Sequence, residues 1–156
     1  MKYAPGQALQ KTSQRRNAYR SIDHLVITAP SLSAGVEYVN HILGVTPQKG
    51  GFHPRMGTHN ALLKFGDSLY LEVIAVDPSA PKRDYPRWFE LDELSSDASP
   101  RLAAWVARTD DVDQASTAST IPLGRIEPMT RGGLNWLITV AEDGSLAEHG
   151  IAPTLI

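Results

Sequence analysis

The chain has 156 residues, of which 42% are hydrophobic and 21% charged, proportions that are ordinary for one globular domain with a sizeable core. Its net charge of -2 gives no broad positive field for a phosphate backbone, so we expect no nucleic-acid partner. The absence of cysteine excludes disulfides, thiol nucleophiles and thiolate metal sites, so any metal site must use imidazole, carboxylate or amide groups. The apolar runs are too short to span a bilayer, and we expect no membrane partner.

The N-terminal 21 residues differ in composition from the rest of the chain. They carry Lys2, Lys11, Arg15, Arg16 and Arg20 and no acidic residue. This composition predicts a flexible basic arm over residues 1–21, followed by one domain over residues 22–156. The same charge balance is typical of a mitochondrial targeting segment, but a proline and a glycine early in the arm weaken a helical interpretation. We therefore expect a cytoplasmic protein, with a mitochondrial location as the alternative.

The first half of the chain predicts a strand, a helix, a loop and a hairpin. Apolar residues recur at helical spacing from Leu32 to Leu43, Ser31 can cap the start of that helix, and Gly44 can close it. Gly, Pro and His dominate residues 48–57, which predicts a loop. The expected strands are residues 22–28, 58–65 and 69–76, the last two joined by a turn at Gly66 and Asp67.

The second half repeats this order after a connector. Proline, serine and charge dominate residues 77–100, with a short helical turn expected near residues 91–94. A strand at 102–109 and a helix at 112–120, capped by Asp110 and Asp111, then return at an offset of about 80 residues. Further strands are expected at 124–128, 134–140 and 152–156. The order βαβββ thus occurs twice, in modules at residues 22–76 and 101–156.

Several strings, in this order and spacing, resemble the glyoxalase-like branch of the vicinal-oxygen-chelate superfamily. They are IDHLV at 22–26, GTHNALL at 57–63, YLEVI at 70–74, PRWF at 86–89 and WVARTDD at 105–111. The resemblance implies an α+β fold in which two βαβββ modules form a curved, cup-like mixed sheet with flanking helices, usually around a divalent metal. Members include isomerases, lyases, epimerases, ring-cleaving dioxygenases and proteins that sequester drugs, so the fold leaves the reaction open.

His24 and Glu72 are the central candidates for the site. Alternate residues of a strand share a face, which places His24 inside the cup, and Glu72 interrupts an otherwise apolar strand where an unpaired carboxylate would be costly. The resemblance implies that both are metal ligands, for Zn, Mn, Fe or Ni, and Glu72 is also a candidate catalytic residue. The alternative is that the two side chains form a hydrogen-bonded pair without a metal.

Two departures from the family pattern leave the implied metal site incomplete. Transferring the repeat by its offset places Ala104 where the second module should supply a ligand, and alanine cannot coordinate a metal. The last strand stops at Ile156, about where the resemblance implies a closing carboxylate or amide.

The hairpin register decides whether His59 or Asn60 shares the cup with Glu72. A two-residue loop at Gly66 and Asp67 would put His59 on that face as a catalytic base, whereas a three-residue loop would put Asn60 there. The sequence leaves both registers open.

The remaining candidates are expected to contact substrate from the rim or floor of the cup. Arg87, beside two aromatic residues, could hold an anionic substrate, or the connector could simply plug the core with its aromatics. His53 could close over the cup from its loop. The full expected substrate-binding set is Asn60, Tyr70, Arg87, Trp105 and His53.

Two functions follow from these residues. The first is a small-molecule enzyme of isomerase, lyase or dioxygenase type, with a divalent metal on His24 and Glu72, acting on a substrate with vicinal oxygens. The second is a binding protein that sequesters a planar or apolar ligand without turnover. The last strand is expected to leave an unpaired sheet edge. We expect this edge to be covered either by a second copy in a homodimer or by residues beyond Ile156.

Overall fold

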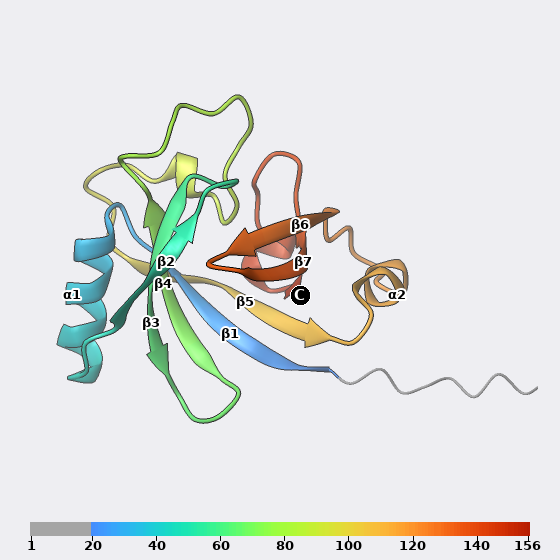
Figure 1. Ribbon diagram of the computed structural model, residues 1–156, viewed down its shortest axis with the longest axis horizontal. Helices are drawn as coiled ribbons and strands as arrows, with labels where there is room; N and C mark the ends of the chain where they lie inside the picture. Colours follow the sequence, from blue (N-terminus) through green and yellow to red (C-terminus); the bar gives the residue numbers. More distant parts are fainter. Residues whose placement is uncertain (1–19) are drawn as a thin grey trace, which may run out of the picture.

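The computed structural model describes residues 20–156, which form an α+β fold (Figure 1). The arm expected over residues 1–21 lies outside the described residues except for Arg20 and Ser21, which begin the first strand. In chain order the elements are β1 (Arg20–Thr28), α1 (Leu32–Leu43), β2 (Gln48–His53), β3 (Thr58–Lys64), β4 (Tyr70–Val76), η1 (Leu91–Glu93), β5 (Arg101–Thr109), α2 (Val112–Thr117), β6 (Arg125–Arg131), β7 (Leu134–Val140), η2 (Ala147–Gly150) and β8 (Thr154–Leu155).

Six strands form one mixed sheet in the order β2-β3-β4-β1-β5-β8, and β6 and β7 form a separate hairpin. β1 runs parallel to β4 and antiparallel to β5, so the two halves of the chain join through these central strands. The predicted α+β class and mixed sheet are therefore confirmed. The second module differs from the first, because β7 meets β8 through a side chain, with the Leu155 amide donating to Thr139 Oγ1 at 2.9 Å, and not through a strand ladder.

Each face of the sheet packs against different elements. On one face Ile27, Leu71 and Val73 pack with Val39 of α1 in one apolar cluster. On the other face Val26 and Ile74 belong to a cluster that includes residues of the connector and of the β6-β7 hairpin. Figure 1 shows α1 on one side of the sheet and the hairpin on the other. Strand alternation therefore separates a helix-covered face from a hairpin-covered face.

The local signals for α1 are confirmed in detail. Ser31 Oγ accepts from the Ala34 amide at 3.2 Å and caps the helix, and Gly44 ends it with a φ of 69°, a conformation that glycine adopts without strain. Asp111 likewise caps α2, although α2 ends at Thr117, earlier than expected.

The prediction of a loop over residues 48–57 is wrong for its first part, because residues 48–53 form β2 at the edge of the sheet. β2 has two consecutive glycines and almost no apolar alternation, the usual signature of a loop. Its structure comes from main-chain pairing with β3, with an irregular register between Lys49 and Phe52. Edge strands need little side-chain burial, so the sequence pattern could not reveal this one.

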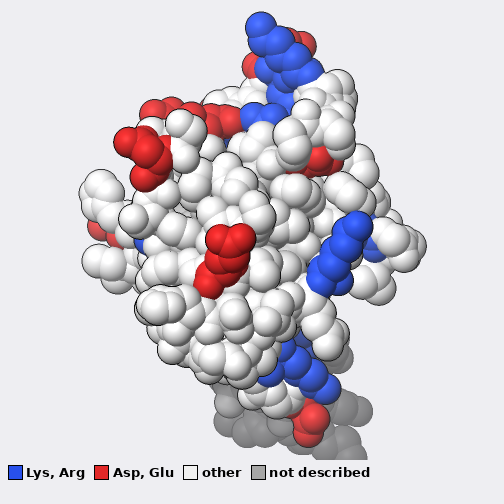
Figure 2. Space-filling view, turned by 90° about the vertical axis from the view of Figure 1, so that its left-hand side faces the viewer, with Lys and Arg blue, Asp and Glu red and all other residues white. Residues whose placement is uncertain are grey.

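The side of the molecule that carries α1 shows few charged side chains (Figure 2). Exposed apolar residues of α1 and the segment after it, Tyr38, Ile42, Leu43 and Val45, belong to this part of the chain. Homodimer formation stays a prediction, which sedimentation would test. None of the helices within residues 20–156 is long and apolar enough to cross a membrane.

Gly35 sets the close approach of α1 to β4. A Cβ at this position would lie 2.4 Å from Val73 Cγ1 and 2.8 Å from Ala29 Cβ. We therefore expect Gly35→Ala to lower the free energy of unfolding by about 1–3 kcal/mol through overpacking, against the better helix propensity of alanine. Urea unfolding measures this, with Glu37→Ala on the exposed face of α1 as the control, expected within about 0.5 kcal/mol of wild type. An unfolding free energy unchanged by Gly35→Ala would contradict the tight contact.

Candidate functional site

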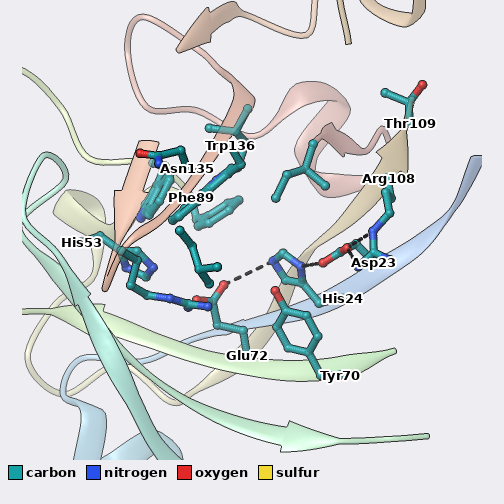
Figure 3. Close-up of a pocket in the computed structure, with 15 residues that line it drawn as sticks. Asp23, His24, His53, Tyr70, Glu72, Phe89, Arg108, Thr109, Asn135 and Trp136 are labelled. Atoms are coloured by element: carbon teal, nitrogen blue, oxygen red, sulfur yellow. Dashed lines mark hydrogen bonds and ion pairs between the residues drawn. The ribbon is translucent and has the colours of Figure 1, made fainter. Parts of the chain in front are cut away.

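A cavity of about 360 Å³ lies between the sheet and the β6-β7 hairpin, a size typical of small-molecule sites (Figure 3). Its wall combines charged and aromatic side chains. The charged or titratable residues are Asp23, His24, His53, Glu72, Arg108 and Arg131. The aromatic residues are Tyr70, Trp88, Phe89 and Trp136.

An irregularity in β1 brings two consecutive side chains to this cavity. The pairing of β1 with β5 shifts between Ile22 and His24, which is the register of a β-bulge at Asp23. In a regular strand Asp23 and His24 would point to opposite faces. Here both line the cavity, and both are 4% exposed. The bulge therefore adds a carboxylate that strict alternation does not predict.

A chain of polar contacts runs along the cavity wall from Arg108 to Asn60. Arg108 Nε donates to Asp23 Oδ2 at 2.6 Å, and Asp23 Oδ1 lies 2.7 Å from His24 Nδ1. His24 Nε2 lies 3.3 Å from Glu72 Oε2, and Asn60 Nδ2 donates to Glu72 Oε1 at 2.5 Å. Figure 3 follows this chain from Arg108 to Glu72. The imidazole is thus held between two carboxylates.

These contacts set the charge state of the pair. Burial opposes the charged form of His24, but hydrogen bonds and the charges of Asp23 and Glu72 outweigh it and raise the pKa of His24 to about 9. Burial also opposes ionisation of Glu72, yet the bonds from His24 and Asn60 lower its pKa to about 2. At neutral pH the site therefore holds a buried imidazolium beside a buried carboxylate.

The hairpin register places Asn60, and not His59, on the face of Glu72. Leu62 pairs with Glu72 and Asn60 with Ile74, because Phe65 still bonds to Leu69 and the β3-β4 loop has three residues, 66–68. Asn60 lies behind Glu72, oriented by the Gly51 amide, which donates to Asn60 Oδ1 at 2.8 Å. The placement of His59 in the cup as a catalytic residue is therefore corrected: His59 lies on the opposite face, next to the ring of Phe52.

Two expected substrate-binding residues line the cavity. The Tyr70 ring stacks on His24, with centroids 4.6 Å apart, and so fixes the plane of the imidazole. His53 is buried, with Nδ1 3.1 Å from Thr58 Oγ1, and burial lowers the pKa of His53 so that it is neutral. It belongs to the wall and to β2, and not to a lid loop.

Two other expected substrate-binding residues are corrected by the structure. Arg87 donates to Asp92 at 2.5 Å and to the Gly57 carbonyl at 3.3 Å, which ties the connector together away from the cavity. Trp105 faces the other side of β5 from Val106, which pairs with His24, and the Trp105 indole donates to the Ile151 carbonyl. Both side chains therefore serve the scaffold.

The sequence pattern missed much of the second-half wall. Arg108 had a usable signal, because it lies in the expected strand 102–109, on the same face as Val106. Arg131 and Trp136 had none, because they lie on a hairpin that packs across the first module and not in its ladder. Trp88 and Phe89 were recognised as an aromatic pair but assigned to the connector, and they also form part of the wall.

The donor set does not fit a resident divalent metal. Ala104 lies buried on β5 opposite Val26, with no group to coordinate. Within residues 20–156 no group of three or more His, Asp and Glu side chains could hold an ion. His24 Nε2 and Glu72 Oε2 lie 3.3 Å apart and would supply two donors, fewer than the three protein ligands of a usual catalytic metal site.

Comparison with known proteins identifies the fold. Residues 22–156 match the family model of the glyoxalase-like domain. No curated protein matches the chain. A hypothetical protein from Staphylococcus aureus aligns with a TM-score of 0.61 and 15% identity, over 88% of this chain and 57% of that one, so this chain spans little more than half of its length.

Methylmalonyl-CoA epimerases share the fold at low identity. A variant of the Streptomyces coelicolor epimerase, in complex with 2-nitronate-propionyl-CoA, aligns with a TM-score of 0.54 and 21% identity over 86% of this chain and 94% of that one. An epimerase in complex with methylmalonyl-CoA and NH4+ aligns with a TM-score of 0.52 and 20% identity, over 86% and 91% of the two chains.

The pKa shifts of the pair predict how stability depends on pH. The contribution of His24 is complete below its ordinary pKa of 6.5 and is lost as pH rises through about 9. That of Glu72 is complete above 4.5 and is lost as pH falls through about 2. Because the two contributions describe one interaction, we expect one stability plateau between pH 4.5 and 6.5.

Urea unfolding at about pH 5.5, 7.5 and 9 measures the alkaline side of this profile. His24→Gln is expected to be less stable than wild type at the lowest of these pH values and to show a smaller further loss up to the highest. Gln114→Ala, which removes no titratable group at an exposed position of α2, serves as the control and keeps the wild-type profile. Parallel wild-type and His24→Gln profiles would show that His24 is not held charged.

Proposed function

Because the chain belongs to the glyoxalase-like domain family, we propose that it is a small-molecule enzyme of the isomerase or lyase type. The proposed reaction moves a proton on carbon next to a carbonyl group. The observation that carries the proposal is the buried His24–Glu72 pair facing a cavity of about 360 Å³. A buried acid and base side by side in a concave site are more typical of catalysis than of structure alone.

The proposed step uses both members of the pair. The substrate carbonyl oxygen accepts a hydrogen bond from His24 Nε2–H, and Glu72 takes the proton from the neighbouring carbon. The electron pair of the broken C–H bond forms the C=C bond of an enolate, and its negative oxygen stays beside the imidazolium. Return of the proton to the opposite face or to the neighbouring carbon completes an isomerisation. Stabilisation of such an oxygen in a water-poor site is usually the largest catalytic contribution.

A carboxylate with a pKa of about 2 is a weak base, but substrate binding itself would strengthen it. A carbonyl that takes the Nε2–H of His24 removes one of the hydrogen bonds that hold the Glu72 pKa down. A ligand that fills the cavity also excludes water from the carboxylate, which raises the pKa further. Asn60 continues to hold the other oxygen and keeps the carboxylate in position.

Asp23 is proposed as a positioning residue. It accepts from the Nδ1–H of His24, which directs the Nε2–H into the cavity, and Arg108 keeps Asp23 ionised. The partner of one ring nitrogen of a histidine commonly decides which nitrogen carries the proton and how the ring is oriented.

A sequestering protein is the second candidate function. The cavity wall carries the rings of Tyr70, Trp88, Phe89 and Trp136, which would bind a planar apolar ligand, and the described part of the chain offers no complete set of metal ligands. Such a protein would bind the same compounds as the proposed enzyme without exchanging their protons.

Hydrogen–deuterium exchange separates the two functions. Protein in D2O is incubated with a panel of small 2-oxo acids, hydroxyketones and a short acyl thioester, and loss of the C–H signal next to the carbonyl is followed by proton NMR. Wild type is expected to accelerate exchange of at least one compound, and Glu72→Gln to lose about 100-fold or more of that acceleration. The control Glu37→Gln, exposed on α1, keeps the wild-type rate.

The other outcomes of this experiment are equally informative. Binding of a compound without exchange would favour the sequestering protein, and equal rates for wild type and Glu72→Gln would exclude Glu72 as the base. A second series with chelator, together with elemental analysis of the purified protein, tests the metal that the family resemblance implies on His24 and Glu72. The proposed step needs no metal, so exchange is expected to survive chelation.

A further inference from the structure

The two arginines of the cavity wall differ in their ion pairing. Asp23 pairs with Arg108, and His24 pairs with Glu72. Arg131 also lines the cavity, yet no carboxylate within residues 20–156 forms an ion pair with it. Of the two arginines in the wall, Arg108 therefore has a carboxylate partner and Arg131 has none in the described part of the chain. A half-buried cation without a counterion is a recognition element for an anionic group.

Arg131 is held over the cavity by both halves of the chain. It stands at the end of β6, where the hairpin turns, and its guanidinium lies 5.8 Å from the centre of the Trp136 ring. Its stem passes over Gly51 of β2, so closely that a Cβ there would lie 3.0 Å from Arg131 Cδ. The side chain is therefore confined between β2 and β7, and a confined guanidinium loses less freedom when it binds a ligand.

The aromatic wall is also short of hydrogen-bond acceptors. The indole nitrogens of Trp88 and Trp136 are buried without a partner in the described part of the chain, and both residues line the cavity. Trp88 is 5% exposed, so water in solvent does not satisfy it. Both nitrogens are covered by protein atoms, so it is the carbon surface of these rings that a ligand in the cavity would meet.

We propose that Arg131 binds the carboxylate of the substrate, so that the substrate class is a small carboxylic acid with a planar or apolar body. A guanidinium presents two parallel N–H groups that match a carboxylate, and Trp136 offers a ring against which the body of the ligand can lie. A single guanidinium matches the charge of one carboxylate, whereas a phosphate dianion would bring a second negative charge close to Asp23 and Glu72. Assignment of this acid as a substrate rests on the proposed function; the anion subsite itself does not.

Benzoylformate is the probe for this subsite. It carries a planar ring, a carbonyl and a carboxylate, but no hydrogen on the carbon next to the carbonyl, so binding is measured without turnover. Its methyl ester keeps the shape and loses the charge. Calorimetric titration of wild type is expected to show at least about tenfold tighter binding of the acid than of the ester, the size of one charge-assisted contact.

Substitutions at Arg131 test the assignment of that preference. Arg131→Gln is expected to bind acid and ester equally, with the affinity for the ester unchanged, and Arg131→Lys to retain part of the preference. The matched control is Arg125→Gln, at an exposed position on the same strand, which should behave as wild type. Far-UV circular dichroism and the unfolding midpoint confirm that each variant is folded.

Three results would overturn the proposal. They are an acid preference that survives Arg131→Gln, equal binding of acid and ester by wild type, and no binding of either compound. Tighter binding of phenylphosphonate than of benzoylformate would replace the carboxylate with a dianion and also count against it. Because Glu72 takes no part in this measurement, an intact acid preference combined with absent deuterium exchange would reject the enzyme and keep the subsite.

Discussion

The buried pair of His24 and Glu72 is the interaction on which the rest of the site depends. A carboxylate at the centre of a sheet is tolerated only when its charge and its hydrogen-bonding atoms are satisfied, and here both oxygens of Glu72 have partners. The imidazolium that satisfies it is itself fixed by Asp23 and by the ring of Tyr70. Removing His24 would leave the buried carboxylate of Glu72 without a counterion, so the elements that bring these partners together, β1, β3 and β4, form one constrained unit.

Much of this unit could be predicted from the sequence because its signals are local. Ser31 and Gly44 mark both ends of α1, and strand alternation assigns His24 and Glu72 to one face. The choice between His59 and Asn60 could not be made in this way, because it depends on one extra residue in the turn between β3 and β4. The position of Asp23 in the cavity wall could not be predicted for a related reason. It depends on a bulge in β1, which appears only in the register of β1 with β5.

The sequence predicted the cavity wall least well in the second half of the chain. There the positions of the side chains depend on tertiary packing and not on local sequence signals. The strand pattern of β6 and β7 indicates a hairpin, but not that the hairpin packs against the inner face of the sheet instead of extending it. That placement brings Arg131 and Trp136 to the cavity, and the same sequence in a continuous sheet would put them elsewhere. The prediction for Arg87 shows the reverse case. Its aromatic neighbours Trp88 and Phe89 line the cavity, whereas Arg87 itself forms an ion pair with Asp92.

The two halves of the chain thus contribute different side chains to one cavity. Ala104 marks the difference, because it stands where the resemblance implies a metal ligand from the second half. A metal ligand at that position would bind an ion together with His24 and Glu72. His24 and Glu72 would both have to lose their protons to bind that ion. With alanine there, Glu72 Oε2 has the His24 ring as its partner at 3.3 Å. The residues that the family resemblance implies as half of a metal site are those that we propose as an acid–base pair. The second half adds the ring of Trp136 and the guanidinium of Arg131 to the wall, the two groups that we propose hold a substrate against the pair.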